Sequence, residues 1–214
     1  MTIDEVIARL TSFPHPLPRG PRAIDPVVVG QLDSLPDWVR LAKGSSPRDA
    51  AALVLIYPDS LREAHLVLTE RPVGGMRHSG QISLPGGAMD AGDDFPVGTA
   101  LREATEEVGL DTAAAGVEMR GVLDTVDVRV SGFMLVPVVA IAAREPVLTP
   151  DEREVAAILR VPVAAFLPHS PIEMVEEERD GYRLRYGAYP FGGYRIWGAT
   201  ARVLGQLGAI LGSR

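Results

Sequence analysis

Three glutamates, Glu103, Glu106 and Glu107, are spaced so that they could bind a metal ion together. In a helix, residues three and four positions apart lie on one face, because 3.6 residues complete a turn. Carboxylates on one face repel each other unless a cation lies between them. Such oxygen ligands, without His or Cys, suit Mg²⁺ or Mn²⁺ better than Zn²⁺. The spacing therefore indicates a divalent metal site, although most glutamate clusters are solvated acidic surface.

Glycine and proline mark both ends of the segment that carries these glutamates. Gly86 and Gly87 predict a tight turn before it, and Gly109 predicts the end of a helix. Pro96 would lie near the first helical turn, where proline is tolerated. We therefore expect a helix over residues 97–108. Because the glycine pair, the expected helix and Gly109 all lie at matching positions around the glutamates, a metal site is favoured over a solvated acidic face.

The same residues resemble the signature of the Nudix hydrolase family. Residues 102–110 match the second half of the family pattern, Arg-Glu-apolar-any-Glu-Glu-any-Gly-apolar, in full. The first half is one residue longer than usual, and either Asp93 or Asp94 replaces the usual Glu. The resemblance implies an α/β fold, an α/β/α sandwich with a mixed β-sheet, with Mg²⁺ or Mn²⁺ as cofactor and a pyrophosphate bond as the target.

Within this resemblance, Glu103 and Glu107 are the first choice as metal ligands, because they lie one helical turn apart. Glu106 lies beside them and could share a second ion or hydrogen-bond to the first ligands. Glu106 and Glu107 are also assigned to catalysis. Arg102 is expected to project from a different face than Glu103 and to orient the glycine turn through the preceding Asp, which is a structural role.

The segment before the signature is similar to that of the coenzyme A pyrophosphatase branch. Residues 66–71 and 77–87 resemble the branch motif, although Arg77 lies one place late and Leu84 replaces a Phe. The implied substrate-binding residues are Arg71, Arg77, His78 and Gly80. The implied reaction cleaves coenzyme A or its thioesters to adenosine 3′,5′-bisphosphate and 4′-phosphopantetheine.

A general base is harder to assign from the sequence. The acidic segment 149–155 corresponds to a region of this branch that carries a Glu-Val step, which is present here as Glu154-Val155. Glu154 is therefore the first candidate for the catalytic base, and Glu152 is the second. The alternative is a solvated acidic loop, with the attacking water activated by metal alone.

Composition limits the other function classes. A net charge of −7 argues against nucleic-acid binding, so an anionic substrate must meet local positive charge or metal. The absence of cysteine excludes disulfides and thiol nucleophiles and fits a cytoplasmic protein. The longest apolar run, residues 133–143, is too short to span a membrane and predicts a buried strand. The sequence leaves a homodimer open.

The chain is predicted to divide into an N-terminal extension, residues 1–47, and a Nudix domain, residues 48–214. The extension would hold short helices and a Pro-rich connector, with Thr2 and Glu5 forming a capping box. The domain would end in a helix over residues 197–211. Its other expected elements are strands at 51–57, 64–69, 82–84, 117–125, 174–178 and 182–186, and a short helix opening at 161–166.

Two other functions fit the same residues. One is a Nudix pyrophosphatase for another nucleoside diphosphate derivative, such as ADP-ribose or NADH, which the displaced Arg77 and the missing Phe allow. The other is a Nudix fold that binds a ligand without turning it over, which the Asp in the signature weakly favours. The three intact glutamates oppose the second alternative, because a binding module would not need them.

Overall fold

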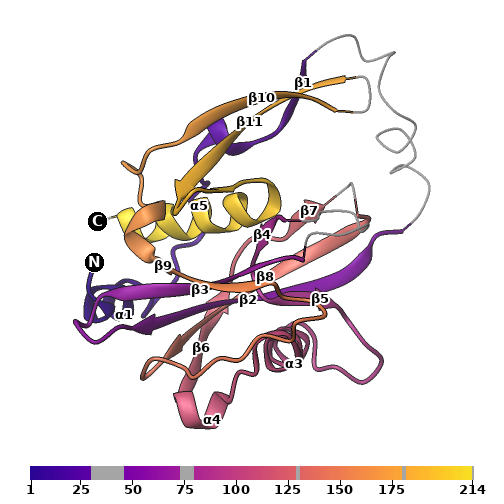
Figure 1. The fold of residues 1–214 in the computed structure, drawn as a ribbon. Helices are drawn as coiled ribbons and strands as arrows, with labels where there is room; N and C mark the ends of the chain where they lie inside the picture. The colour runs from indigo at the N-terminus through magenta and orange to yellow at the C-terminus, as the bar shows by residue number, and fades with distance from the viewer. Residues whose placement is uncertain (30–45, 73–79, 129–130, 180–181, 214) are drawn as a thin grey trace.

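The computed structural model describes residues 1–29, 46–72, 80–128, 131–179 and 182–213. Its centre is a mixed β-sheet with the strand order β4-β3-β2-β8-β6, in which β2 and β8 are parallel and the other pairs antiparallel (Figure 1). The shorter strands β5, β7 and β9 pair with β2, β8 and β3. The strands of this sheet are β2 (Arg48–Pro58), β3 (Ala64–Glu70), β4 (Ile82–Ser83), β5 (Gly86–Ala88), β6 (Val117–Val122), β7 (Val126–Val128), β8 (Phe133–Ala142) and β9 (Ala157–Pro162).

Strand β2 is apolar on both of its faces because a helix covers each side of the sheet. Successive side chains alternate between the faces of a strand. Leu53 and Leu55 lie in the cluster with helix α3 (Val97–Val108), and Val54 and Ile56 lie in the cluster with helix α5 (Gly198–Gly212). This arrangement is the α/β/α sandwich with a mixed sheet that the sequence predicted.

A second sheet lies on the far side of α5 from the central sheet (Figure 1). It has the order β1-β11-β10, formed by β1 (Val27–Val29), β11 (Tyr182–Phe191) and β10 (Glu173–Arg179), and β12 (Tyr194–Ile196) also pairs with β11. The β10–β11 hairpin was expected from the sequence, but β1 was not. Helix α5 therefore lies between the two sheets, and ten of its residues are buried.

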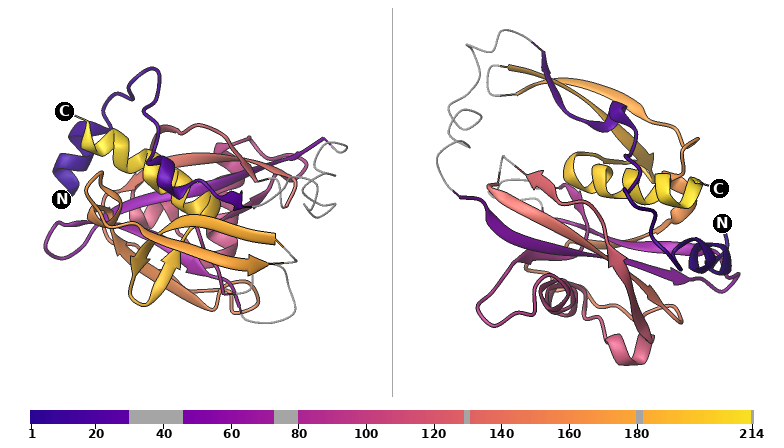
Figure 2. Two further views of the ribbon diagram at one scale, coloured as in Figure 1. Left: turned by 90° about the horizontal axis from the view of Figure 1, so that it is seen from above. Right: turned by 180° about the vertical axis from the view of Figure 1, so that it is seen from behind.

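The N-terminal residues join both sheets into one body. Helix α1 (Ile3–Arg9) begins at Thr2, and the predicted capping box with Glu5 is present. Figure 2 shows this helix beside the C-terminal end of α5, where the guanidinium of Arg9 donates to the carbonyl of Leu211. A 3-10 turn, η1 (Arg22–Ile24), then leads into β1. The division at residues 47 and 48 stays a prediction.

Several boundaries differ from the sequence prediction. The segment at 161–166 is divided between the end of β9 and a 3-10 turn, η3 (Val163–Phe166). The expected strand at 117–125 ends at Val122, and β7 follows it, while a short helix α4 (Thr112–Ala115) precedes it. The apolar run at 133–143 forms β8, as predicted. In the part of the chain that is described, no helix is long and apolar enough to cross a membrane.

The contact between α5 and η3 should be intolerant of any side chain at Gly208. A Cβ there would lie 1.8 Å from the carbonyl oxygen of Phe166, although Gly→Ala inside a helix is ordinarily stabilising. We expect Gly208→Ala to lower the free energy of unfolding by about 1–3 kcal/mol, as overpacking does. Chemical denaturation would measure it.

The adjacent Ala209→Gly variant is the control, because it loses only helix propensity, about 0.5–1 kcal/mol. A Gly208→Ala protein as stable as the wild type would contradict the close approach of α5 to η3.

Candidate active site

Helix α3 brings the three signature glutamates to the edge of the central sheet. The helix covers residues 97–108, as predicted, and Gly109 ends it in the left-handed conformation at φ +64°. Its buried side includes Ala100, Ala104 and Val108, which pack on the sheet. The glutamates lie next to this buried side. The carboxylates of Glu103 and Glu107 are therefore close to strand β5.

Arg102 holds the segment around this helix together. Its Nη2 donates to the carbonyl of Ala88 at 2.9 Å and to Asp93 at 3.0 Å, and its Nε also donates to Asp93 at 3.2 Å. Asp93 in turn accepts from the Thr99 hydroxyl and from the backbone N–H of Asp90. These bonds, led by those from Arg102, hold the pKa of Asp93 well below its usual range. Arg102 therefore has the predicted structural role.

Two points of the sequence analysis are settled here. The acid that pairs with Arg102 is Asp93 rather than Asp94, so the extra residue of the signature lies between Asp93 and Arg102. The expectation that Arg102 projects away from Glu103 was wrong, because its Nη1 lies 3.0 Å from Glu103 Oε1. A long guanidinium can fold back over its own helix and reach a neighbouring side chain, which the helical spacing alone does not reveal. The same nitrogen lies 2.9 Å from Glu106.

Glu107 is the buried member of the three glutamates. Its residue is only 6% exposed, and its Oε2 accepts a hydrogen bond from the backbone N–H of Gly86 at 3.2 Å. Burial raises the pKa of Glu107 to about 7, opposed by the Gly86 hydrogen bond and the nearby Arg71 guanidinium. An additional positive charge near this carboxylate would stabilise its ionised form and lower its pKa.

Glu103 occupies space that a side chain at Gly87 would fill. A Cβ on Gly87 would come within 2.5 Å of Glu103 Oε1, so the carboxylate lies directly against the glycine strand. Burial raises the pKa of Glu103, and the charges of Glu106 and Glu154 raise it further, while Arg102 lowers it. Glycine is therefore needed at position 87 because the Glu103 carboxylate occupies the space of a side chain. The tight turn predicted at Gly86 and Gly87 is wrong, since both residues lie in strand β5 and pair with β2.

These residues fit a divalent cation by their chemistry. Glu103 and Glu107 are carboxylates with raised pKa values, and the negative charge of Glu154 contributes to both shifts. Glu106 is more exposed, at 59% of its side chain, and pairs with Arg102. Among the described residues, no three carboxylate or imidazole groups are already gathered closely enough to hold a metal ion. The metal ligands Glu103, Glu106 and Glu107 thus stay a prediction, supported by the unfavourable charge density.

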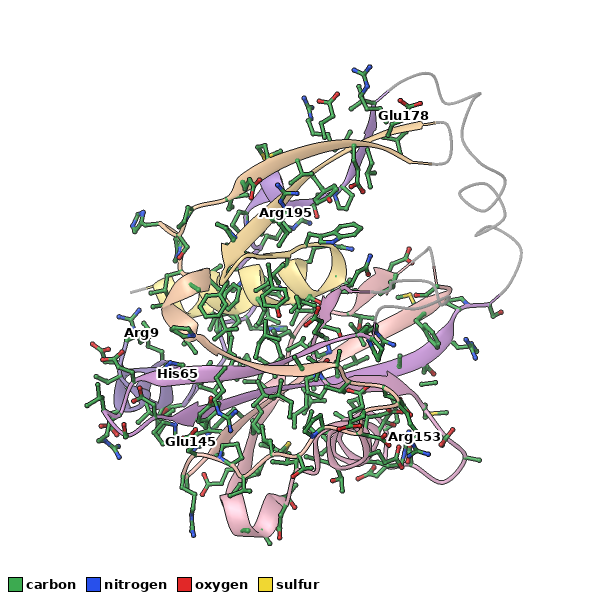
Figure 3. The ribbon with its side chains drawn as sticks, viewed as in Figure 1. Arg9, His65, Glu145, Arg153, Glu178 and Arg195 are labelled. Carbon is green, nitrogen blue, oxygen red and sulfur yellow. The ribbon has the colours of Figure 1, made fainter. Side chains whose placement is uncertain are left out.

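The acidic loop at 149–155 is fastened to the end of α3. The N–H groups of Thr149 and Asp151 donate to the carbonyls of Val108 and Glu107, each at 2.9 Å. Figure 3 labels Arg153 of this loop beside the helix, where it pairs with Asp151. The loop thereby brings Glu154 close enough to raise the pKa of Glu103 and Glu107.

Glu154 is exposed, and its charge raises the pKa of both Glu103 and Glu107. Glu152, the second candidate, is not among the leading causes of either shift in pKa. The assignment of Glu154 as the catalytic base therefore stays a prediction, supported by this charge influence.

Of the predicted substrate-binding residues, two are described. Arg71 follows β3 and lowers the pKa of Glu107 through its charge. Gly80 donates to the Arg71 carbonyl at 3.1 Å, and the N–H of Arg71 donates to Gln81. These bonds close the base of the loop between β3 and β4. Arg77 and His78 lie outside the described residues.

A pocket of about 330 Å³, which we call the inner pocket, opens beside the glycine strand. Its lining includes Arg71, Gly86, Gly87, Leu84, Leu135 and Trp197. Sequence reasoning did not assign Leu135 or Trp197 to a site. Trp197 lies at the start of the expected C-terminal helix and Leu135 in the expected buried strand at 133–143, so neither position indicated a site.

The burial of Glu107 generates a stability prediction for the metal-free protein. Its folded pKa, about 7, lies above the ordinary 4.5, so the stability that protonated Glu107 contributes is lost as pH rises through 7. Glu107→Gln removes this loss, on the order of 1–3 kcal/mol, and should raise the melting temperature by several degrees at pH 8.5 but little at pH 4.5. Differential scanning calorimetry would measure this difference.

Glu118→Gln is the matched control, because the Glu118 side chain is 71% exposed, pairs with Arg120 and lies outside the candidate site. Added Mg²⁺ or Mn²⁺ should stabilise the wild type and the control at pH 8.5 but not Glu107→Gln, since ligands that bind the folded state raise its stability. Equal metal-induced shifts in all three proteins would remove Glu107 from the metal site.

Comparisons with known proteins agree with this geometry. Residues 47–183 match the NUDIX domain family. A protein of Salmonella paratyphi B described as an uncharacterized Nudix hydrolase, NudL, is 36% identical over 161 residues, covering 75% of this chain and 82% of its own. The Salmonella dublin protein of that name is 35% identical over 170 residues, covering 79% and 86%.

Among solved structures, a Nudix hydrolase from M. smegmatis, RenU, shares 27% identity and a TM-score of 0.46, over 55% of this chain and 72% of that one. The family match covers most of this chain, and the NudL relatives are more than 30% identical to it. The chain belongs to the Nudix family and is a Nudix hydrolase.

Proposed function

We propose that this Nudix hydrolase cleaves the pyrophosphate bond of coenzyme A or its thioesters, with a divalent cation held by Glu103 and Glu107. The observation that carries the proposal is the junction of α3 and β5. There, the buried carboxylate of Glu107 and the partly buried carboxylate of Glu103, both with raised pKa values, lie next to a pocket that Arg71 and the glycine strand border. The similarity of residues 66–71 and 77–87 to the coenzyme A pyrophosphatase branch supports this substrate.

The substrate is anionic and the site is acidic, so the two repel each other. A divalent cation, when bound, would neutralise charge on the phosphates and the glutamates. Arg71 adds a fixed positive charge on the substrate side, where a guanidinium can hold phosphate oxygens in a bidentate manner. The backbone N–H of Gly86, which donates to Glu107, keeps that carboxylate turned toward the glycine strand.

Water must attack one phosphorus atom while the bond to the bridging oxygen breaks. Glu154 would accept the proton of this water, because it is exposed and its charge raises the pKa of both Glu103 and Glu107. The proton leaves the attacking water, and the bridging oxygen leaves with the second phosphate group. Glu106, which is exposed and paired with Arg102, would add a further carboxylate to the cation site.

The substrate can be tested directly with purified protein and Mg²⁺ or Mn²⁺. Coenzyme A, its 3′-dephospho form, ADP-ribose and NADH form the panel, and chromatography identifies the products. We expect coenzyme A to give adenosine 3′,5′-bisphosphate and 4′-phosphopantetheine at the highest kcat/KM. Faster turnover of ADP-ribose or NADH would replace the proposed substrate, and no turnover of any substrate would favour a ligand-binding role.

Glu154→Gln tests the base. Removing a general base costs about 10²–10⁴-fold in rate, so kcat should fall by that order while the metal concentration needed for half activity changes little. Glu152→Gln, two residues earlier on the same loop, is the matched control and should retain its rate. If the two variants behave alike, the water is activated without Glu154.

A further inference from the structure

A second pocket lies between the second sheet and the β3–β4 region. It encloses about 780 Å³, and we call it the outer pocket. Its lining includes Tyr186, Trp197, Phe191, Glu173, Glu177 and Arg195. Figure 3 labels Arg195, which extends from β12 near the second sheet and pairs with Glu173 at 2.8 Å. None of these residues belongs to the signature that carries the catalytic chemistry.

The inner and outer pockets share Trp197 and Gln81 in their linings. Trp197 immediately precedes α5, and its ring stacks on Tyr186 with the ring centroids 4.4 Å apart and the planes inclined by 25°. The position of Trp197 is therefore fixed on one side by the second sheet. The two pockets are neighbours that meet at one aromatic wall.

The two pockets differ in chemistry. Among the described residues that line the inner pocket, Arg71 alone is charged, and most of the others are apolar or glycine. The described lining of the outer pocket includes three charged side chains, Glu173, Glu177 and Arg195, beside four aromatic ones. An uncharged group is suited to the first, and a flat group with polar edges is suited to the second.

A substrate with two different halves matches this division. We propose that Trp197 separates two subsites: the inner pocket takes the uncharged pantetheine arm, and the outer pocket takes the purine nucleotide. This inference rests on the proposed function, because the pyrophosphate between the halves must lie at Arg71 and the glycine strand. Arg71 lines the inner pocket at that position.

The outer pocket offers a purine the contacts that such bases use. The stacked pair of Tyr186 and Trp197 provides an aromatic wall, and bases stack on aromatic side chains. Carboxylates such as Glu173 can accept hydrogen bonds from an exocyclic amine. In the inner pocket, by contrast, Phe133 already has the Arg48 guanidinium over its ring, 4.4 Å from the centroid.

Two variants should separate the subsites when the two halves are supplied as separate ligands. Ala199, at the start of α5, lines the inner pocket and not the outer one. Ala199→Phe should weaken 4′-phosphopantetheine binding at least tenfold and change adenosine 3′,5′-bisphosphate binding less than threefold. Trp197→Leu keeps an apolar wall but removes the ring, so it should do the reverse. Isothermal titration calorimetry would measure both ligands with both variants.

The protein contains two tryptophans, so Trp38→Phe leaves Trp197 as a single fluorescent reporter. Adenosine 3′,5′-bisphosphate should quench its emission, whereas inorganic phosphate at the same concentration should not. Leu135→Phe, on β8, narrows the inner pocket from another element and should reproduce the effect of Ala199→Phe. Circular dichroism would confirm that the variants are folded.

The outcomes separate this inference from the proposed function. If coenzyme A is hydrolysed but Ala199→Phe weakens both ligands equally, or the nucleotide more, the division at Trp197 is wrong and the function stands. If coenzyme A is not hydrolysed and neither half binds, both proposals fail. Opposite selectivity of the Ala199 and Trp197 variants would establish the two subsites.

Discussion

The guanidinium of Arg102 is the interaction on which the candidate site depends. It joins the carbonyl of Ala88 at the end of the glycine strand, the carboxylate of Asp93 in the following loop, and Glu103 and Glu106 on its own helix. A single side chain thus fixes the strand, the loop and the helix relative to one another. Because guanidinium is planar and always charged, lysine could not make the same set of bonds.

That fixed geometry makes the ionised forms of the buried Glu107 and the partly buried Glu103 unfavourable. The backbone N–H of Gly86 donates to Glu107, and the Glu103 carboxylate lies where a side chain of Gly87 would be. Strand β5 is therefore in close contact with both carboxylates. The acidic loop adds Glu154 from the other direction through its hydrogen bonds to the end of α3. The negative charges of these carboxylates therefore exceed the positive charges of Arg102 and Arg71. A bound cation would reduce the repulsion between them. Functional sites commonly keep such unfavourable charge arrangements.

The sequence predicted the elements whose signals are local. The helix at 97–108 was found with its bounds, because a glycine pair, a proline and a glycine stop lie within one segment. The capping box at Thr2 and the β10–β11 pairing were found for the same reason. Strand β1 was missed, because three valines after a Pro-rich segment pair with β11, more than 150 residues away, and nothing in their own neighbourhood indicates that partner.

The same distinction holds for the site. Helical spacing predicted that Glu103 and Glu107 lie together, and the signature predicted that Arg102 pairs with an Asp, but neither could choose between Asp93 and Asp94. That choice depends on how the extra residue is accommodated before α3. The reach of Arg102 to Glu103 was predicted wrongly, since side-chain direction depends on contacts beyond the helix. Pocket walls such as Trp197 come from segments about 100 residues apart and require the tertiary structure.

The second sheet extends the site beyond the family signature, and its attachment shows how. The Tyr194 hydroxyl donates to Glu70 at 3.0 Å, immediately before Arg71, and the Thr200 hydroxyl donates to the carbonyl of Ile82 at 3.0 Å. Both bonds join the C-terminal segment to the two strands that flank the β3–β4 loop. The segment that carries Trp197 is therefore held against the base of the loop from which Arg71 and Gly80 come. Under the proposed arrangement of two subsites, a change in the C-terminal segment would alter the substrate side of the site and leave α3 and its glutamates in place, and selectivity and catalysis would depend on separate parts of the chain.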